Sequence, residues 1–364
     1  MKTSVIVPYT NNHQMTINFL KHTLPIVASK GYQLVLVRDS KSSVELERDI
    51  KQLIQGRSDV IHLVDTPNQG YSIANNRGVA ASNGDLLVFI NDDVFLQDDS
   101  TIETLTAKLL SDDKIGVVQA LLLYPNSGSV QTTGHIFGEF HNSHALVNRR
   151  SDAPIVQTEA VRQAVSSALY IMRRQTFQSF GGFDERYFNA WDGMDLSLRI
   201  TESGMTCLYC PTAVGYHIQG GSRETIFRDE SYQAAYFWAK HKGLYRCDFQ
   251  DLVYEQLKAL PTFSVSNPVH ILNFSSQAFC EWQPLLDLFT AIQSQQWILP
   301  HAKNAAIKLE EATFLDELLS YPRIIYLVDN YTHIKNNRYV FSLRDCTADV
   351  VIDLAANALP VTEL

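Results

Sequence analysis

The chain has 364 residues, enough for one large domain and a smaller one, and its 45% hydrophobic content suffices for a sizeable core. Its formal net charge of −9 argues against nucleic acid as the main partner, because binding a phosphate backbone requires a basic surface. The sequence shows neither a signal-peptide pattern nor an apolar run of transmembrane length, which predicts a cytoplasmic protein. Peripheral association with the inner face of a membrane remains open.

The N-terminal part of the chain alternates between strand patterns and helix patterns. Ala74, Gly78 and Ser82 fall four residues apart, so a helix here carries a stripe of small side chains that can approach a sheet closely. The predicted strands cover residues 3–7, 34–37, 60–64 and 86–90. Two further helices are predicted over residues 13–29 and 44–54. Such alternation predicts a parallel sheet with helices on both faces and right-handed crossovers.

Polar residues follow three of these strands. They are Tyr9–Asn12, Arg38–Ser43 and the run Asn91-Asp92-Asp93. The carboxyl ends of parallel strands are where ligands bind in open α/β sheets, so these loops predict a nucleotide-type cleft. The adjacent carboxylates repel each other, and a divalent cation would relieve that repulsion while holding a diphosphate. A solvated turn at the strand end is the alternative.

Further along, the pattern continues with predicted strands at 116–123 and 167–172. Between them, residues 125–144 read as a long loop rich in Gly, Ser, Asn and His. A helix is predicted to begin near Asp192. Asp192 and Asp195 lie three residues apart, so they share one face near the helix N-terminus, where the dipole favours carboxylates. One of them could take a proton from a substrate hydroxyl, or Asp192 could simply cap the helix.

Three segments, in this order, resemble the inverting glycosyltransferases of family 2, in particular their rhamnosyltransferase-like branch, which has the GT-A fold. They are Ser4–Pro8 with Asn11, the pattern N-x-G-x-x-x-A-x-N-x-G over 68–78, and Phe89–Val94, which is similar to the family's metal segment. The resemblance covers residues 3–225 and implies that Asp93 is the principal ligand of Mn²⁺ or Mg²⁺. It also implies a set of donor-binding residues: Pro8, Tyr9, Asn11, Asp39, Asn68, Gly70, Asn76, Asn91, Asp92 and Arg223.

Two later segments extend the resemblance. Residues 192–199 are similar to the family's E-D-x-D-L-x-x-R segment, with Asp192 in the place of the Glu and Gly193 in the place of the next Asp. This implies that Asp192 is the first candidate for the catalytic base and Asp195 the second. Trp191 could stack on an acceptor sugar or belong to the core. Residues 217–223 resemble the H-x-x-G-G-S-R ending, so His217 is a candidate metal ligand, or else a buried strand histidine, and Arg223 a diphosphate clamp.

The resemblance stops near Asp248, which predicts a domain over 1–245 and a small α/β appendage over 246–364. The appendage could serve acceptor recognition, self-association or docking to a partner enzyme. Its predicted strands cover 270–274, 323–328 and 350–354, and its predicted helices 282–294 and 305–319.

The resemblance thus implies a metal-dependent, inverting glycosyltransferase of bacterial surface polysaccharide synthesis. It would move a sugar from a UDP- or dTDP-sugar to a hydroxyl of a glycan or glycoconjugate. Arg38 stands where the family has the Asp that contacts the base; together with Gly193, it leaves open a non-catalytic sugar-nucleotide-binding or scaffolding subunit. A nucleotidyltransferase is disfavoured, because Tyr9–Asn12 is neither Gly-rich nor basic.

Overall fold

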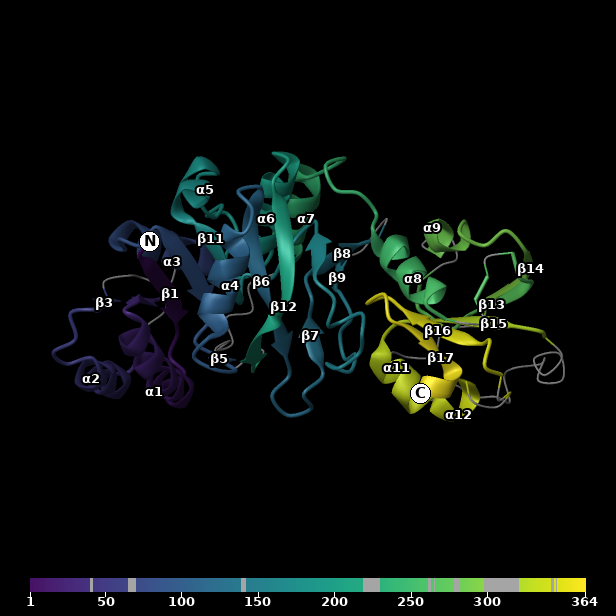
Figure 1. The fold of residues 1–364 in the computed structure, drawn as a ribbon, viewed down its shortest axis with the longest axis horizontal. Coiled ribbons are helices and arrows are strands. Elements are labelled where there is room, and N and C mark those ends of the chain that lie inside the picture. Colours follow the sequence, from purple (N-terminus) through teal and green to yellow (C-terminus); the bar gives the residue numbers. More distant parts are fainter. Residues whose placement is uncertain are drawn as a thin grey trace. The chain divides into compact units, whose positions relative to one another are not determined.

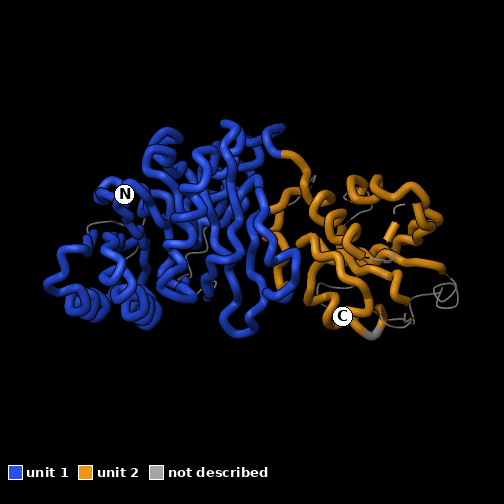
Figure 2. The backbone as a smooth tube through the Cα atoms, in the orientation of Figure 1, with its two compact units in different colours: residues 1–135, 150–245 blue, residues 136–149, 246–364 orange. Residues whose placement is uncertain are grey.

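The computed structural model describes residues 1–39, 42–64, 70–138, 142–218, 230–260, 263–264, 266–277, 282–297, 321–341, 344 and 346–364. The chain divides into two compact units, shown in blue and orange in Figure 2. Unit 1 comprises residues 1–135 and 150–245, and unit 2 comprises residues 136–149 and 246–364. The sequence-based division placed residues 136–149 in the first domain, whereas in the structure they pack in unit 2.

Unit 1 is built on a mixed, mostly parallel sheet (Figure 1). Its strands are β1 (Thr3–Tyr9), β2 (Gln33–Arg38), β3 (Val60–Leu63), β4 (Leu86–Ile90), β5 (Val94–Leu96), β6 (Ile115–Leu123), β7 (Val130–Thr132), β10 (Ala160–Arg162), β11 (Leu169–Arg173) and β12 (Thr206–His217). The order is β10-β12-β6-β11-β4-β1-β2-β3, with β5 paired to β12 and β7 to β6. Strands β4, β1, β2 and β3 run parallel, as do β6 and β12, whereas β11 runs antiparallel between β4 and β6.

Helices cover both faces of this sheet, as predicted. They are α1 (His13–Lys30), α2 (Val44–Leu53), α3 (Tyr71–Ala81), α4 (Thr101–Leu110), α5 (Arg174–Ser179), α6 (Asp192–Glu202) and α7 (Glu230–Lys240). The fully apolar strand β4 shows why two layers are needed, since Leu86, Val88 and Ile90 belong to a core with α1, α2 and α4. Leu87 and Phe89 belong to a second core with α3, α5 and α6.

The small-residue stripe of α3 lies against the sheet. A Cβ atom on Gly78 would come within 2.5 Å of Ile6 on β1 and 3.0 Å of Val37 on β2. Glycine therefore permits a separation between α3 and the sheet that any larger residue would prevent. This confirms the close approach that the four-residue spacing predicts.

Two local predictions between residues 125 and 217 need correction. Residues 125–144 are not one long loop, because they contain β7, β8 (His135–Phe137) and β9 (Asn142–His144). The strand that begins at Thr206 continues to His217, with an irregular register between Cys210 and Val214. The interruption accommodates Pro211, which cannot donate a ladder hydrogen bond.

Unit 2 has a smaller sheet of its own. Its strands are β13 (Val269–Asn273), β14 (Ile292–Trp297), β15 (Ile324–Val328), β16 (Val350–Asp353) and β17 (Ala358–Pro360), in the order β14-β13-β15-β16-β17. The first four run parallel and β17 antiparallel. The remaining elements are α8 (Phe249–Lys258), α9 (Gln283–Leu286), α11 (Tyr331–Asn336), α12 (Arg338–Phe341) and η3 (Val361–Glu363).

Three predicted strands of the appendage are confirmed as β13, β15 and β16, but the predicted helix 282–294 is wrong. Only α9 is helical there, and Ile292 already begins β14. The polar sequence of β14 suits an edge strand, which pairs on one side only, so its hydrophobic pattern gives little signal. The other predicted helix, 305–319, falls outside the described residues. Of the helices in the described part of the chain, none combines the length and the apolar character that crossing a membrane demands.

Residues 136–149 are joined to the late part of unit 2 by hydrogen bonds. The N–H of Leu146 donates to the carbonyl of Ala355 at 2.9 Å, and the Asn357 side chain donates to the carbonyl of Val147 at 2.9 Å. The N–H of Phe137 donates to the Asp248 carboxylate at 2.8 Å. Unit 2 is therefore assembled from two segments far apart in sequence.

Candidate active site

Strand pairing brings Asp93 and His217 together at the carboxyl end of β4. The chain turns after Asn91, and β5 pairs antiparallel with β12 so that Val94 lies opposite His217. The N–H of Ile218 donates to the carbonyl of Asp93 at 2.9 Å. Nε2 of His217 lies 3.1 Å from Oδ1 of Asp93, and the Asp93 side chain is only 2% exposed.

The hydrogen-bond partners of His217 indicate which of its ring nitrogens carries a proton. Nδ1 of His217 is 2.5 Å from Oε1 of Gln131, whose amide nitrogen donates to the His217 carbonyl at 3.3 Å and so fixes the amide orientation. Nδ1 therefore carries a proton toward Gln131, and when the ring is neutral Nε2 presents a lone pair. Although close to Nε2, Oδ1 of Asp93 is buried and makes no hydrogen bond. Two lone pairs facing each other favour a cation in contact with both.

The donor set fits a divalent cation. A carboxylate oxygen and an imidazole nitrogen oriented by a second hydrogen bond are ligands that Mn²⁺ accepts. Within the described residues there is no cluster of three His, Cys, Asp or Glu side chains that could hold a metal. A cation here would therefore take further ligands from outside this pair, for example the oxygens of a diphosphate.

The two residues before Asp93 have different surroundings. Oδ2 of Asp92 accepts a hydrogen bond from the Thr16 hydroxyl on α1 at 2.8 Å, and burial raises the pKa of Asp92 to about 7. Asp92 thus ties the strand end to α1. Oδ1 of Asn91 is buried without a hydrogen-bond partner among the described residues, so this amide is available to a ligand.

The predicted base-binding residues lie on the ends of β1 and β2. The N–H of Asp39 donates to the carbonyl of Tyr9 at 2.8 Å, and Oδ1 of Asp39 accepts from the N–H of Gly70 at 2.9 Å. Oδ1 of Asn11 accepts from the N–H of Ser43 at 2.7 Å. Pro8 is buried on β1, where it pairs with Val37. These contacts hold the two strand-end loops and the start of α3 in one arrangement.

Tyr9 differs from the prediction, because its ring is fully buried in the core. Its hydroxyl lies 2.8 Å from the Glu47 carboxylate and 2.7 Å from Nε2 of His62. Burial, followed by the hydrogen bond to Glu47, raises the pKa of Tyr9 well above its usual value. The Tyr9 side chain is therefore held by Glu47 and His62, and the predicted donor contact at this position stays a prediction.

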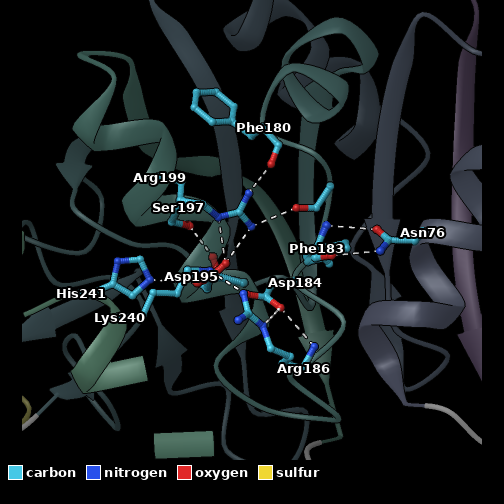
Figure 3. Close-up of polar contacts among 12 residues, drawn as sticks. Asn76, Phe180, Phe183, Asp184, Arg186, Asp195, Ser197, Arg199, Lys240 and His241 are labelled. Atoms are coloured by element: carbon cyan, nitrogen blue, oxygen red, sulfur yellow. Dashed lines mark hydrogen bonds and ion pairs between the residues drawn. The ribbon is translucent and has the colours of Figure 1, made fainter. Parts of the chain in front are cut away.

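Gly70 and Asn76 on α3 also have structural partners. Gly70 has a positive φ of 91°, and a side chain there would overlap the backbone of Phe188, to whose carbonyl the N–H of Tyr71 donates at 2.6 Å. The Asn76 amide accepts from the N–H of Phe183 and donates to its carbonyl, at 3.0 and 2.9 Å (Figure 3). Asn76 therefore holds the backbone at Phe183, and its predicted donor contact stays a prediction. Asn68 and Arg223, two further predicted donor contacts, lie outside the described residues.

Asp192 opens α6 in a buried position. Its side chain is 4% exposed, and Oδ1 accepts a hydrogen bond from the Ser167 hydroxyl at 3.1 Å. Burial raises the pKa of Asp192 to about 6, against the opposing effect of the Ser167 bond. The residue before it, Trp191, has a φ of 71°, a left-handed conformation that is strained for a large side chain. A carboxylate with a pKa near neutrality can take up a proton during reaction.

Asp195, three residues later, has side-chain partners on both of its carboxylate oxygens (Figure 3). Its Oδ1 lies 2.5 Å from Nζ of Lys240 and 2.9 Å from Nε2 of His241, and Arg199 contacts Oδ2 at 2.7 and 2.9 Å. Burial alone would raise the pKa of Asp195, but the His241 hydrogen bond, Arg199 and Lys240 outweigh it and lower the pKa. The predicted second candidate base is therefore held as an anion by the elements around it.

Trp191 packs among aromatic side chains of α7. Its ring centroid lies 4.9 Å from that of Phe237 and 5.9 Å from that of Trp238. The side chain is half-buried, so part of the ring remains accessible. These contacts account for its rigidity and leave the predicted acceptor contact untested.

Tyr71 connects the two groups of acidic residues. Its hydroxyl donates to the carbonyl of Ser167 at 2.8 Å. Burial raises the pKa of Tyr71, and the charges of Asp192 and, more weakly, Asp93 act in the same direction. Both carboxylates are therefore within electrostatic reach of one hydroxyl. Sequence reasoning missed Tyr71, Ser167 and Gln131, because each contacts a residue far away in the sequence that no local pattern shows.

The matches to known proteins agree with this geometry. The model of the glycosyltransferase-like family 2 matches residues 4–259, so the chain belongs to that family, and the fold of unit 1 is of the GT-A type. The O-antigen biosynthesis protein RfbC of Myxococcus xanthus is 27% identical over 253 residues, which are 66% of this chain and 20% of that protein.

A second relative and one solved structure support the same class. The N-acetylglucosaminyl-diphospho-decaprenol L-rhamnosyltransferase of Mycobacterium tuberculosis is 35% identical over 81 residues, 22% of this chain and 24% of the relative. The crystal structure of GalNAc-T7 with UDP, GalNAc and Mn²⁺ superposes with a TM-score of 0.51 at 17% identity, covering 72% of this chain and 53% of that one. The chain thus spans about a quarter or less of these two curated relatives.

Proposed function

We propose that the protein is a metal-dependent, inverting glycosyltransferase that moves a sugar from a UDP- or dTDP-sugar to a hydroxyl of a glycan or glycoconjugate. Family membership supports the reaction class, and the names of the two relatives support a role in bacterial surface polysaccharide synthesis. The presence of UDP and Mn²⁺ in the GalNAc-T7 structure supports a nucleotide donor and a divalent metal.

The observation that carries the proposal is the pairing of Asp93 with His217. A buried carboxylate oxygen without a hydrogen bond faces an imidazole lone pair across 3.1 Å, at the sheet edge where α/β folds bind ligands. A divalent cation held by these atoms would neutralise charge on the departing nucleoside diphosphate.

Asp192 and Asp195 have different roles in the proposed reaction. Asp192 takes the proton from the acceptor hydroxyl as that oxygen attacks the anomeric carbon, and its pKa of about 6 suits this role near neutral pH. Because the hydroxyl attacks from the face opposite the diphosphate, the configuration at the anomeric carbon inverts. Asp195 keeps the first turn of α6 in place through its contacts with α7.

The test is a thermal-shift screen of UDP, dTDP, GDP and CMP, each with and without Mn²⁺, on the wild type and on Asp93→Asn. We expect one nucleotide to stabilise the wild type only when Mn²⁺ is present, because a ligand that binds only the folded state raises its melting temperature. Asp93→Asn should lose this response. Asp113→Asn, whose side chain is fully exposed, is the matched control and should keep it.

If Asp93→Asn is stabilised as much as the wild type, Asp93 is not a ligand of the metal. Absence of stabilisation by every nucleotide would favour the scaffolding role that the sequence leaves open. Nucleotide binding without sugar transfer or donor hydrolysis would favour a non-catalytic binding subunit.

A further inference from the structure

Ser167 occupies a fixed position between the Asp93 segment and the start of α6. The carbonyl of its neighbour Ala168 accepts a hydrogen bond from the N–H of Asn91 at 3.1 Å, which continues the pairing of β11 with β4. The carbonyl of Ser167 itself accepts from the Tyr71 hydroxyl at 2.8 Å. Its main chain is thus held from two sides, by the segment that carries Asp93 and by α3.

From this position the Ser167 hydroxyl donates to Oδ1 of Asp192 at 3.1 Å. In the described part of the chain it is the single side-chain donor to Asp192; the other hydrogen bonds to this carboxylate come from the backbone of Asp192 and Gly193. Ser167 therefore orients one oxygen of the carboxylate through its side chain.

Gly193 makes this contact possible. A Cβ atom at residue 193 would lie 2.8 Å from both Cβ and Oγ of Ser167 and 3.1 Å from its backbone nitrogen, closer than real side chains approach. The family motif has an acidic residue at this place, so Ser167 stands in space that such a side chain would need. The glycine at position 193, where the family motif has an acidic residue, is therefore what makes room for Ser167.

We propose that Ser167 is a positioning residue for the base Asp192, and that Gly193 is glycine so that Ser167 can approach. This inference rests on the proposed function, since it requires Asp192 to act as the base. The other ionisable groups whose charges act on or with Asp192 are Asp195, Tyr71 and Tyr170. Burial raises the pKa of both tyrosines, so they stay neutral, and the Asp195 charge is constant across the tested pH range.

The experiment compares pH profiles of kcat and KM for wild type, Ser167→Ala and Ser167→Cys. Loss of the hydroxyl removes a bond that favours the ionised carboxylate, so the acidic limb of kcat should move to higher pH by about 0.5–1 pH unit in Ser167→Ala. The isosteric thiol is a weaker donor and should give an intermediate shift. The donor KM should not change.

Gly193→Ala is expected to reproduce the shift of the acidic limb, because the added methyl group displaces Ser167. Ser203→Ala is the matched control, since that hydroxyl donates only to the carbonyl of Ile200 at the end of α6. It should keep the wild-type profile.

An equal loss of kcat at every pH in Ser167→Ala and Ser167→Cys, or no change of the limb in either, would overturn the positioning role. Asp192→Asn separates this failure from failure of the proposed function. If Asp192→Asn is inactive while both Ser167 variants titrate like the wild type, only the positioning role fails. If Asp192→Asn retains full activity, the assignment of the base fails.

Discussion

The two carboxylates at the start of α6 lie three residues apart but have opposite surroundings. Asp192 receives one side-chain hydrogen bond and has a raised pKa, whereas Asp195 contacts Arg199, Lys240 and His241 and has a lowered pKa. Sequence spacing places both on one helix face but cannot distinguish them, because partners such as Ser167 and Lys240 lie far from α6 in the sequence. A positioned base and a structural anion therefore differ only in their tertiary partners.

The activity should depend on pH through Asp192. Because the carboxylate is the reactive form and its pKa is about 6, kcat should fall as the pH drops through about 6. Asp192→Asn should lower kcat by about 10²- to 10⁴-fold, the usual contribution of a general base. Rate measurements between pH 5 and 8 on both proteins check this. A wild-type rate that stays constant down to pH 5 would contradict the assigned pKa.

The same substitution should stabilise the fold. A folded-state pKa raised from 3.8 to about 6 means that the folded state binds more protons than the unfolded state, so stability decreases as the pH rises through this interval. The difference of about two pH units corresponds to about 3 kcal/mol, at 1.36 kcal/mol per unit. Asp192→Asn should therefore melt several degrees above the wild type at pH 8, and the gap should close near pH 4, where Asp192 is protonated. An equal gap at both values would refute this explanation.

On the scale of elements, Asp195 links α6 to the end of α7 through its contacts with Lys240 and His241. Lys240 bridges Asp195 and Asp184, and His241 lies 2.9 Å from Asp195 (Figure 3). Removing one charge from a buried ion-pair cluster leaves the others uncompensated, which costs about 3–5 kcal/mol. Asp195→Asn should accordingly lower the free energy of unfolding by about that amount, in contrast to Asp192→Asn. Urea denaturation monitored by circular dichroism measures it.

A surface ion pair provides the comparison for Asp195. Lys30 and Glu103 lie 2.6 Å apart, but the Glu103 side chain is 51% exposed. Glu103→Gln should therefore cost less than about 1 kcal/mol. Equal losses in Asp195→Asn and Glu103→Gln would show that burial adds nothing to the cluster.

The elements of unit 1 follow closely from its sequence, and the reason is visible at β4. A continuous apolar run such as Leu86–Ile90 has one stable environment, between two helical layers, so both the strand and the polar loop after it are predictable. The polar strand β14 offers no such run, and the predicted helix over 282–294 extends into its first residues. The side-chain contacts of Asn76 and Tyr9 are likewise not predictable from the local sequence, because their partners Phe183 and Glu47 lie on distant parts of the chain.

On the scale of the whole chain, unit 2 depends on residues inserted within unit 1. Removing residues 246–364 would take away the partners of residues 136–149, including Asp248, Ala355 and Asn357. In a variant that ends at Tyr245, trypsin should therefore cut after Arg149 or Arg150 faster than in the full chain. Mass spectrometry of the early fragments checks this. Equal cleavage rates in both proteins would mean that residues 136–149 keep their fold without those partners.

The hydrogen bond between Leu146 and Ala355 also has a consequence for biosynthesis. Residues leave the ribosome in order, so residues 136–149 are outside the exit tunnel long before Ala355 and Asn357 have been translated. During that interval the strands on both sides of residues 136–149 can already pair, while these residues still lack their neighbours in unit 2. Completion of unit 2 therefore has to wait for translation of Ala355 and Asn357, and a nascent chain stalled before Ala355 would present residues 136–149 to chaperones and proteases.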